Sequence, residues 1–142
     1  SDCRPLNGLI AEMLAVCPEI HCLRDATRGG IATVLNEFTQ DSGVCIHLWE
    51  QQIPVREVVQ GVCEILGLDP LYLANEGTLV AVVPADQAEI VLSTMRTHPD
   101  GQHSCQIGVV SESPKGRVIL QTTFGGERVV DVLYGEQLPR IC

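Results

Sequence analysis

The chain has 142 residues, of which 45% are hydrophobic and 19% are charged, and its formal net charge is −9. A chain of this length can bury the core of one ordinary domain. No apolar run approaches the roughly 18 residues that a membrane-spanning helix needs. The nine Lys and Arg residues form no basic stripe, which argues against nucleic acid or an anionic membrane surface as the main partner. The sequence predicts a soluble globular domain.

The first residues of the chain predict that it is part of a longer protein, and its cysteines predict the compartment in which it works. The chain begins Ser1-Asp2-Cys3, without Met and without a basic-then-apolar signal segment, so we expect a piece of a longer protein. Its seven cysteines are an odd number without a CxxC pair, which is typical of a reducing compartment and predicts a cytoplasmic protein. Cys45 and Cys63 lie in apolar stretches and are expected to be buried. No His and Cys spacing matches a zinc pattern, so we predict no metal site.

Hydrophobic periodicity predicts helices alternating with strands. Apolar residues recur at helical spacing in the segments 6–14, 31–38, 55–66 and 88–95. Strands are predicted at 44–49, 78–83, 106–110, 117–122 and 128–131. Turns between the last strands favour antiparallel hairpins there. The predicted fold class is α+β, with helices layered on one mixed, largely antiparallel β-sheet, and residues 1–132 are expected to form this domain.

The segment before the second predicted helix ends in Gly29 and Gly30 and is the first candidate site. Glycines at a helix start leave backbone N–H groups uncovered, and the helix dipole adds to their attraction for an anion. Thr27 is a candidate helix cap and Asp25 a candidate acceptor within the loop. Arg28 supplies a planar donor for phosphate or carboxylate. An ordinary capped helix with a glycine turn is the alternative interpretation.

The second candidate site is Asn75-Glu76-Gly77, which interrupts a β run. A carboxylate between apolar strand segments, beside a glycine, is expected in a partly desolvated pocket. Burial there would raise the pKa of Glu76 toward the range of a general base, with Asn75 beside it. An exposed hairpin turn is the alternative. His21, ahead of the first motif, is a candidate for the same pocket, and a purely structural histidine is its alternative.

The chain ends in Pro139-Arg140-Ile141-Cys142. Proline holds φ at about −65° and lacks a backbone donor, so residues 133–142 are expected to form a semi-rigid arm. The sulfur of Cys142 lies at the tip of this arm. A thiol in that position can be modified at one site and carried to another.

Taken together, the glycine motif, the Asn75-Glu76-Gly77 element and the terminal cysteine resemble the HypE family of hydrogenase maturation proteins, the carbamoyl dehydratases. The resemblance is to a C-terminal domain that this family shares with aminoimidazole ribonucleotide synthetase and selenophosphate synthetase. It covers essentially the whole chain. Ala26 departs from the family pattern, in which proline is more usual, but alanine can adopt the same backbone angles.

The resemblance implies an ATP-dependent reaction, with Mg²⁺, that converts a carboxamide on the terminal sulfur into a thiocyanate, the cyanide donor for the iron of nickel–iron hydrogenase. A HypF-type carbamoyltransferase would load the sulfur, and a HypC–HypD scaffold complex would receive the product. Cys142 would be the covalent carrier and Glu76 the general base. The residues expected around the substrate and phosphate are Asp25, Thr27, Arg28, Gly29, Gly30, Asn75 and His21.

The resemblance also implies an N-terminal domain, absent from this chain, that holds most of the ATP site and forms a homodimer. The 142 residues alone are therefore expected to be inactive. Two other functions remain open. The chain could be a synthetase-type domain for a small-molecule amide, with Cys142 incidental, or a docking module for hydrogenase maturation partners that does no chemistry.

Overall fold

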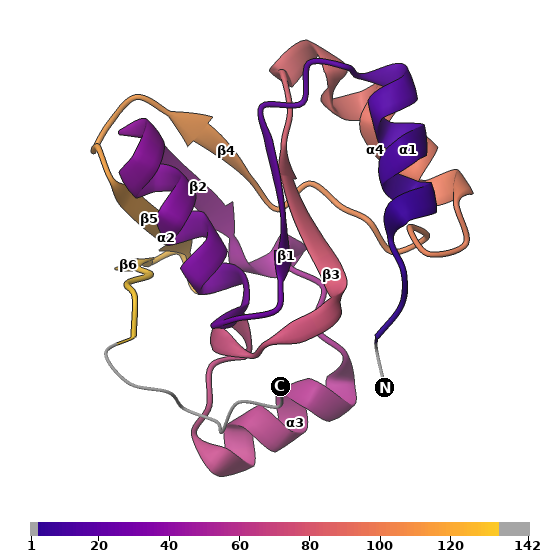
Figure 1. Cartoon of the computed structure of the whole chain (residues 1–142). Helices are drawn as coiled ribbons and strands as arrows, with labels where there is room; N and C mark the ends of the chain where they lie inside the picture. Colours follow the sequence, from indigo (N-terminus) through magenta and orange to yellow (C-terminus); the bar gives the residue numbers. More distant parts are fainter. Residues whose placement is uncertain (1–2, 134–142) are drawn as a thin grey trace.

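The computed structural model describes residues 3–133 (Figure 1). Residues 134–142, which include Cys142 and most of the predicted arm, lie outside the described residues. The four predicted helices are confirmed: α1 (Asn7–Val16), α2 (Gly30–Ser42), α3 (Glu57–Leu66) and α4 (Ala88–Thr97). The strands are β1 (Cys22–Ala26), β2 (Cys45–Trp49), β3 (Asn75–Val82), β4 (Gly108–Ser111), β5 (Arg117–Gln121) and β6 (Glu127–Val129). Short 3₁₀ turns are η1 (Glu50–Gln52), η2 (Pro70–Tyr72) and η3 (Ala85–Gln87).

Within the described residues, the strands form two sheets rather than the one sheet that the sequence predicted. β1 and β3 pair as an antiparallel ribbon, and the other sheet has the order β4-β2-β5-β6. The predicted α+β class and the largely antiparallel pairing are confirmed, because only β2 and β5 run parallel. The expected hairpin between β4 and β5 is wrong, since these two strands lie on opposite sides of β2. β2 therefore forms hydrogen bonds along both of its edges.

The strand β1 was missing from the sequence prediction. It is only five residues long, and its Arg24 and Asp25 are exposed, so it carries no clear alternation of apolar and polar residues. Its pairing with β3, from Cys22 opposite Val82 onward, supplies the backbone partners that hold it extended. The segment that the sequence suggested as a loop is thus a strand up to Ala26.

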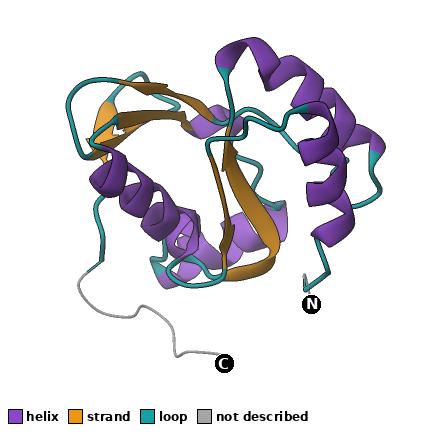
Figure 2. Cartoon of the chain, turned by 45° about the horizontal axis from the view of Figure 1, so that its top comes forward, coloured by secondary structure: helices purple, strands orange, loops and turns teal. Residues whose placement is uncertain are grey.

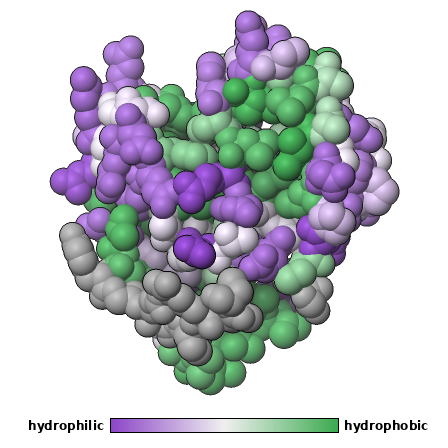
Figure 3. Space-filling view, in the orientation of Figure 1, coloured by the Kyte–Doolittle hydropathy of each residue, from purple (hydrophilic) through white to green (hydrophobic). Residues whose placement is uncertain are grey.

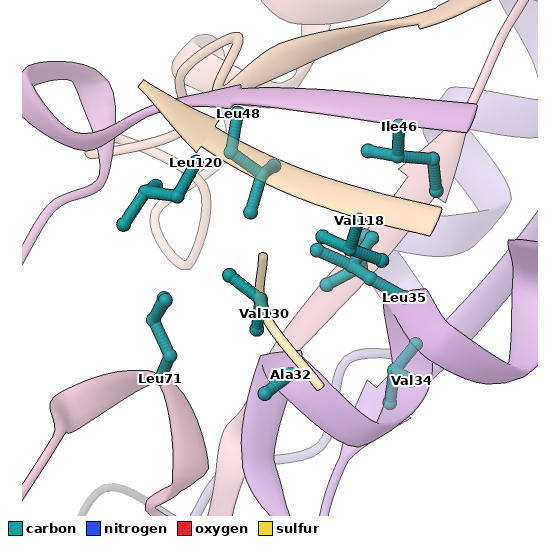
Figure 4. Packing of buried hydrophobic residues seen from close by; sticks show 10 residues of the cluster. Ala32, Val34, Leu35, Ile46, Leu48, Leu71, Val118, Leu120 and Val130 are labelled. Carbon is teal, nitrogen blue, oxygen red and sulfur yellow. The ribbon is translucent and has the colours of Figure 1, made fainter. Parts of the chain in front are cut away.

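The larger hydrophobic core lies between α2 and the four-stranded sheet, and Figure 4 shows its side chains converging from these two layers. Buried Asn36 of α2 joins the core to the last described segment, because its side-chain amide donates to the carbonyls of Ala32 (2.8 Å) and Val130 (2.9 Å). The buried members of this core are Ala32, Val34, Leu35, Ile46, Leu48, Leu71, Val80, Val118, Leu120 and Val130.

A second core holds α1 and α4 together, and both helices lie on the side of the β1–β3 ribbon away from α2 (Figures 1 and 2). Its buried members are Leu9, Met13, Cys17 and Val91. Leu23 of β1 and Leu79 of β3 pack against them. The ribbon therefore has helices on both sides. Cys45 and Cys63 are buried, as the sequence predicted.

Candidate functional site

The β1–β3 ribbon brings the two candidate motifs together. Asp25 lies opposite Leu79, but the next residue, Ala26, lies opposite Asn75, so the register shifts between these two pairs. The residues 76–78 therefore have no partner on β1 and form a bulge. Because Ala26 leads into the glycine motif, this bulge lies beside the start of α2. The sequence suggested both motifs, and the register shift makes them neighbours.

The bulge has a defined internal geometry. The side-chain oxygen of Asn75 accepts a hydrogen bond of 2.7 Å from the backbone N–H of Gly77, which is the arrangement of an Asx turn. Glu76 is at the tip of this turn, and its side chain is exposed. The expected burial of Glu76 is therefore wrong for this chain. The carboxylate instead borders a shallow depression of about 330 Å³ that Cys3, Arg4 and Pro5 also line.

The start of α2 differs from its predicted capping. The N-cap residue is Gly29, in the left-handed region at φ 65°, and none of the described side chains caps the helix. Thr27 is therefore not the cap, and its hydroxyl instead lies 3.3 Å from a carboxylate oxygen of Asp25, to which it donates. This contact confirms Asp25 as an acceptor within the loop.

Gly30 is the tightest point of the site. It is buried, its φ is also 65°, and a Cβ added there would lie 2.4 Å from the carbonyl oxygen of Leu71 and 2.8 Å from that of Leu73. Only glycine allows the helix start and η2 to approach this closely. Exposed Gly29 and exposed Arg28 leave the solvent side of the helix start accessible. Arg24 is ion-paired with Glu37, which ties β1 to α2.

His21 does not belong to this group of residues. It immediately precedes β1, and its backbone N–H donates to the carbonyl of Val82, at the far end of β3 from Asn75. A strand rises ~3.3 Å per residue, so five residues separate His21 from Ala26 by about 16 Å. The prediction that His21 lines the Glu76 pocket is wrong, because β1 is extended rather than looped.

Residues that sequence reasoning missed hold the last described segment beside η2. The Tyr72 hydroxyl donates to the carbonyl of Asp131 (2.7 Å), and burial, followed by the neighbouring Asp69 carboxylate, raises the pKa of Tyr72. Asp69 also forms an ion pair of 2.6 Å with Arg128. These contacts fix where the chain lies before residues 134–142. In the sequence, the Asp69-Pro70 pair, which is typical of a turn, was a local signal for this group of residues.

A cavity of about 480 Å³ lies away from these motifs, at the ends of β2 and β5. Trp49, Glu50, Arg96 and Cys105 are among its lining residues. Burial raises the pKa of the Cys105 thiol, which donates to the carbonyl of Gln52 at 3.1 Å. None of the candidate site residues lines this cavity.

In the described part of the chain, no helix is long and apolar enough to cross a membrane. The same residues contain no group of three or more His, Cys, Asp or Glu side chains placed to hold a metal ion.

Comparison with protein families identifies the domain. The family described as AIR synthase related protein, C-terminal domain, matches residues 1–121. Among curated relatives, the carbamoyl dehydratase HypE of Azotobacter vinelandii is 56% identical over 142 residues, which is 100% of this chain and 42% of the relative. HypE of Escherichia coli K12 is 46% identical over the same length, which is 41% of that protein. The chain thus spans about two-fifths of these relatives.

Solved structures agree with the sequence matches. A crystal structure of the hydrogenase maturation protein HypE in complex with ATP superposes with a TM-score of 0.93 at 44% identity, covering 100% of this chain and 44% of that one. The structure of a HypE–HypF complex gives a TM-score of 0.89 at 44% identity, covering 94% of this chain and 43% of that one. The chain belongs to the family of AIR synthase related protein C-terminal domains, and the HypE proteins are relatives that it matches over its whole length.

Proposed function

We propose that this chain is the C-terminal part of an ATP-dependent carbamoyl dehydratase that acts on its own Cys142. The observation that carries the proposal is the pairing of Ala26 with Asn75, which brings a carboxylate beside an accessible helix start. The similarity of the whole chain to carbamoyl dehydratases supports the same function.

The proposed reaction starts from a carboxamide on the sulfur of Cys142. The amide oxygen attacks the terminal phosphorus of ATP, the bond from that phosphorus to the ADP oxygen breaks, and ADP leaves. The amide oxygen, a poor leaving group, thereby becomes part of a phosphate, which is a good one. The C–O bond then breaks, both N–H protons are lost, and a carbon–nitrogen triple bond forms. Carboxamide and ATP thus give thiocyanate, ADP and phosphate, with the elements of water ending in the phosphate.

Glu76 is the proposed general base for the N–H protons. A base must reach the proton that it removes within hydrogen-bond distance, directly or through one water. The Asx turn at Asn75 supports this role, because it holds the Glu76 backbone while the carboxylate points to solvent. An incoming arm can therefore meet the carboxylate without rearrangement of the bulge.

The helix start is the proposed site for the phosphoryl oxygens. Backbone N–H groups at the beginning of a helix and a guanidinium both attract anions. Gly29 and Arg28 are exposed, which leaves room for such a group, whereas Gly30 is packed against η2 and contributes rigidity. Asp25 and Thr27 position this loop through their mutual hydrogen bond.

The ATP molecule itself would be held mainly by the part of the longer protein that lies outside this chain. We assign Mg²⁺, which ATP-dependent sites bind largely through the nucleotide's phosphates, to that part as well. The 142 residues alone are therefore proposed to be inactive. Homodimer formation is assigned to the same missing part.

Cys142 is proposed as the carrier, on an arm formed by residues 133–142. A thiol of ordinary pKa is only slightly ionised at neutral pH. We therefore assign activation of the thiol to a HypF-type carbamoyltransferase. A solved complex of the relative HypE with HypF supports that partner. A HypC–HypD complex is the proposed acceptor of the cyanide.

Mass spectrometry of the C-terminal peptide of the full-length protein tests the proposal. We expect the peptide to gain a carboxamide after incubation with the carbamoyltransferase and its substrates, and then to lose one water when ATP is added. Cys142→Ser should abolish both changes while ATP binding persists. If Cys142→Ser instead left an ATP-dependent reaction with a small-molecule amide, the chain would be a synthetase-type domain and the carrier role would be wrong.

The docking-module alternative is separated by a second variant. Glu76→Gln preserves the size of the side chain and removes the base. Loss of dehydration with intact binding of the carbamoyltransferase supports catalysis by Glu76. Loss of partner binding with normal dehydration of a preloaded arm would support a docking role.

A further inference from the structure

The helix α3 carries an apolar face that the described chain leaves uncovered. Four large side chains on it are exposed: Val58 by 78%, Val62 by 48%, Ile65 by 84% and Leu66 by 62%. They follow the i, i+4, i+7, i+8 spacing of one helix face. Figure 3 shows hydrophobic residues gathered at the bottom of the molecule, where α3 lies in Figure 1. A contiguous exposed apolar patch of this kind marks an interaction surface.

Gly61 lies within the same face, three residues after Val58 and four before Ile65. A Cβ added to Gly61 would meet no atom within 4 Å, and the residue is in the interior of α3. Glycine in a helix interior destabilises it by about 1 kcal/mol relative to alanine, and no contact among residues 3–133 requires a glycine here. A glycine between four apolar side chains lets another backbone approach the helix axis closely.

We propose that this α3 face, formed by Val58, Gly61, Val62, Ile65 and Leu66, is the surface against which the part of the longer protein outside this chain packs. The relatives provide that occupant, because this chain spans only 42% of the curated HypE of Azotobacter vinelandii. The proposal concerns assembly of the protein, and only its second argument, that α3 lies near the candidate site, rests on the proposed function.

The chemistry of the face favours a permanent neighbour. Its residues are all apolar, whereas the polar residues Gln60 and Glu64 hydrogen-bond to each other (2.9 Å) outside the face. Permanent interfaces resemble a domain core, while partners that come and go meet more polar surfaces. A loading or delivery partner would leave these side chains in water between encounters. A segment of the same polypeptide covers them throughout.

The position of α3 adds a second argument. The helix is followed by η2, and the backbone of η2 lies against Gly30 at the start of α2. The bulge with Asn75 begins a few residues later. A segment that packs on α3 is therefore near the candidate site. This is where a missing part that completes the site has to lie.

Hydroxyl-radical footprinting of the dilute full-length protein tests the assignment without any activity measurement. Ile65 and Ile90 form a matched pair, because Ile65 is 84% exposed and Ile90 48% exposed in this chain. From these exposures Ile65 should be labelled faster than Ile90 in this chain alone. In the full-length protein we expect the opposite, with Ile65 labelled several-fold less than Ile90. Faster labelling of Ile65 than of Ile90 would overturn the proposal.

Protection that comes from another source would also overturn it. Protection of Ile65 that appears only at high protein concentration would assign the face to a second copy. Protection only on addition of the carbamoyltransferase would assign it to that partner, and protection lost on deletion of residues 134–142 would assign it to the C-terminal segment. Loss of thiocyanate formation with Ile65 still protected would refute the proposed function alone.

A substitution at Gly61 provides an independent readout. Alanine is the better helix former, so Gly61→Ala should stabilise α3 if the face is free. We expect the opposite in the full-length protein: a lower melting temperature and increased labelling of Ile65, because the methyl group separates the packed surfaces. Gln60→Ala, on the polar side of α3, is the control for helix propensity. A more stable Gly61→Ala protein with unchanged Ile65 labelling would contradict the close packing.

Discussion

Gly30, at the start of α2, lies directly against the backbone of Leu71 in η2, so close that a Cβ on Gly30 would be 2.4 Å from the Leu71 carbonyl oxygen. The contact joins the glycine motif to the segment that leads into the Asn75 bulge. It therefore holds both halves of the candidate site in place. The left-handed backbone at Gly30 and its close neighbour each require glycine.

This contact predicts a large loss of stability for Gly30→Ala. The left-handed conformation costs alanine roughly 1–2 kcal/mol, and relieving the overlap with Leu71 adds about 1–3 kcal/mol. Gly43→Ala is the matched control, because Gly43 also has φ 65° but nothing lies within 4 Å of its added Cβ. Chemical denaturation should show a clearly smaller loss for Gly43→Ala. Equal losses would mean that η2 moves aside at no cost.

The Asx turn predicts different consequences for the two polar residues of the bulge. In the full-length protein, Glu76→Gln should slow dehydration of the loaded arm by about 10²–10⁴-fold, the usual contribution of a general base. Because the side chain is exposed, the melting temperature should not change. Single-turnover assays with the preloaded protein measure this rate. The exposed residue Glu112, changed to Gln, is the control.

Asn75 should hold Glu76 in position and should not itself take part in proton transfer. Asn75→Ala removes the acceptor for the Gly77 N–H, so dehydration should slow while the pH profile keeps its shape. Asn75→Asp retains a side-chain acceptor and should restore most of the rate. A pH profile displaced by Asn75→Ala would instead indicate that Asn75 takes part in proton transfer.

The hydrogen bonds of buried Asn36 predict that both Asn36→Ala and Asn36→Asp destabilise the protein, and that the aspartate variant loses more stability. Its amide is the donor to the carbonyls of Ala32 and Val130. Asn36→Ala leaves the buried Val130 carbonyl without this donor and should cost about 1–3 kcal/mol. Asn36→Asp should cost more, because it places a carboxylate against two carbonyl oxygens. Urea denaturation measures both. An aspartate variant as stable as the alanine variant would show that water reaches this position.

The hydrogen bonds of the Glu50 carboxylate predict that the protein loses stability in acid. The backbone N–H and the hydroxyl of Thr123 both donate to one Glu50 carboxylate oxygen, at 2.7 and 2.8 Å, and lower the pKa of Glu50. A pKa lowered by folding stabilises the protein above the pKa of the unfolded state, about 4.3. This contribution is lost as the pH falls through the folded-state value.

The measurement is the melting temperature between neutral pH and about pH 3, a range that brackets the ordinary glutamate pKa. Glu50→Gln should be less stable than the wild type at neutral pH, and the difference should narrow in acid. Glu112→Gln should follow the wild-type curve. A constant difference across the range would show that the loss comes from packing and not from ionisation.

Local patterns in the sequence were sufficient to predict the four helices and to single out both candidate motifs. Helical spacing of apolar residues depends on neighbours within two turns, so α2 and α4 could be located without knowledge of the rest of the fold. The same holds for burial of Cys45 and Cys63, which lie in apolar stretches. The sequence also suggested that Asp25 accepts a hydrogen bond from its own loop, and it does.

Tertiary structure decided which of these residues meet and which are exposed. β1 exists because β3 pairs with it, and the register shift after Asp25 leaves Glu76 exposed at the tip of a bulge. The same extended strand carries His21 away from the site, and the parallel pairing of β2 with β5 replaces an expected hairpin. Strand register depends on hydrogen bonds between residues far apart in the chain. Periodicity contains no record of such pairs, so only the folded chain specifies them.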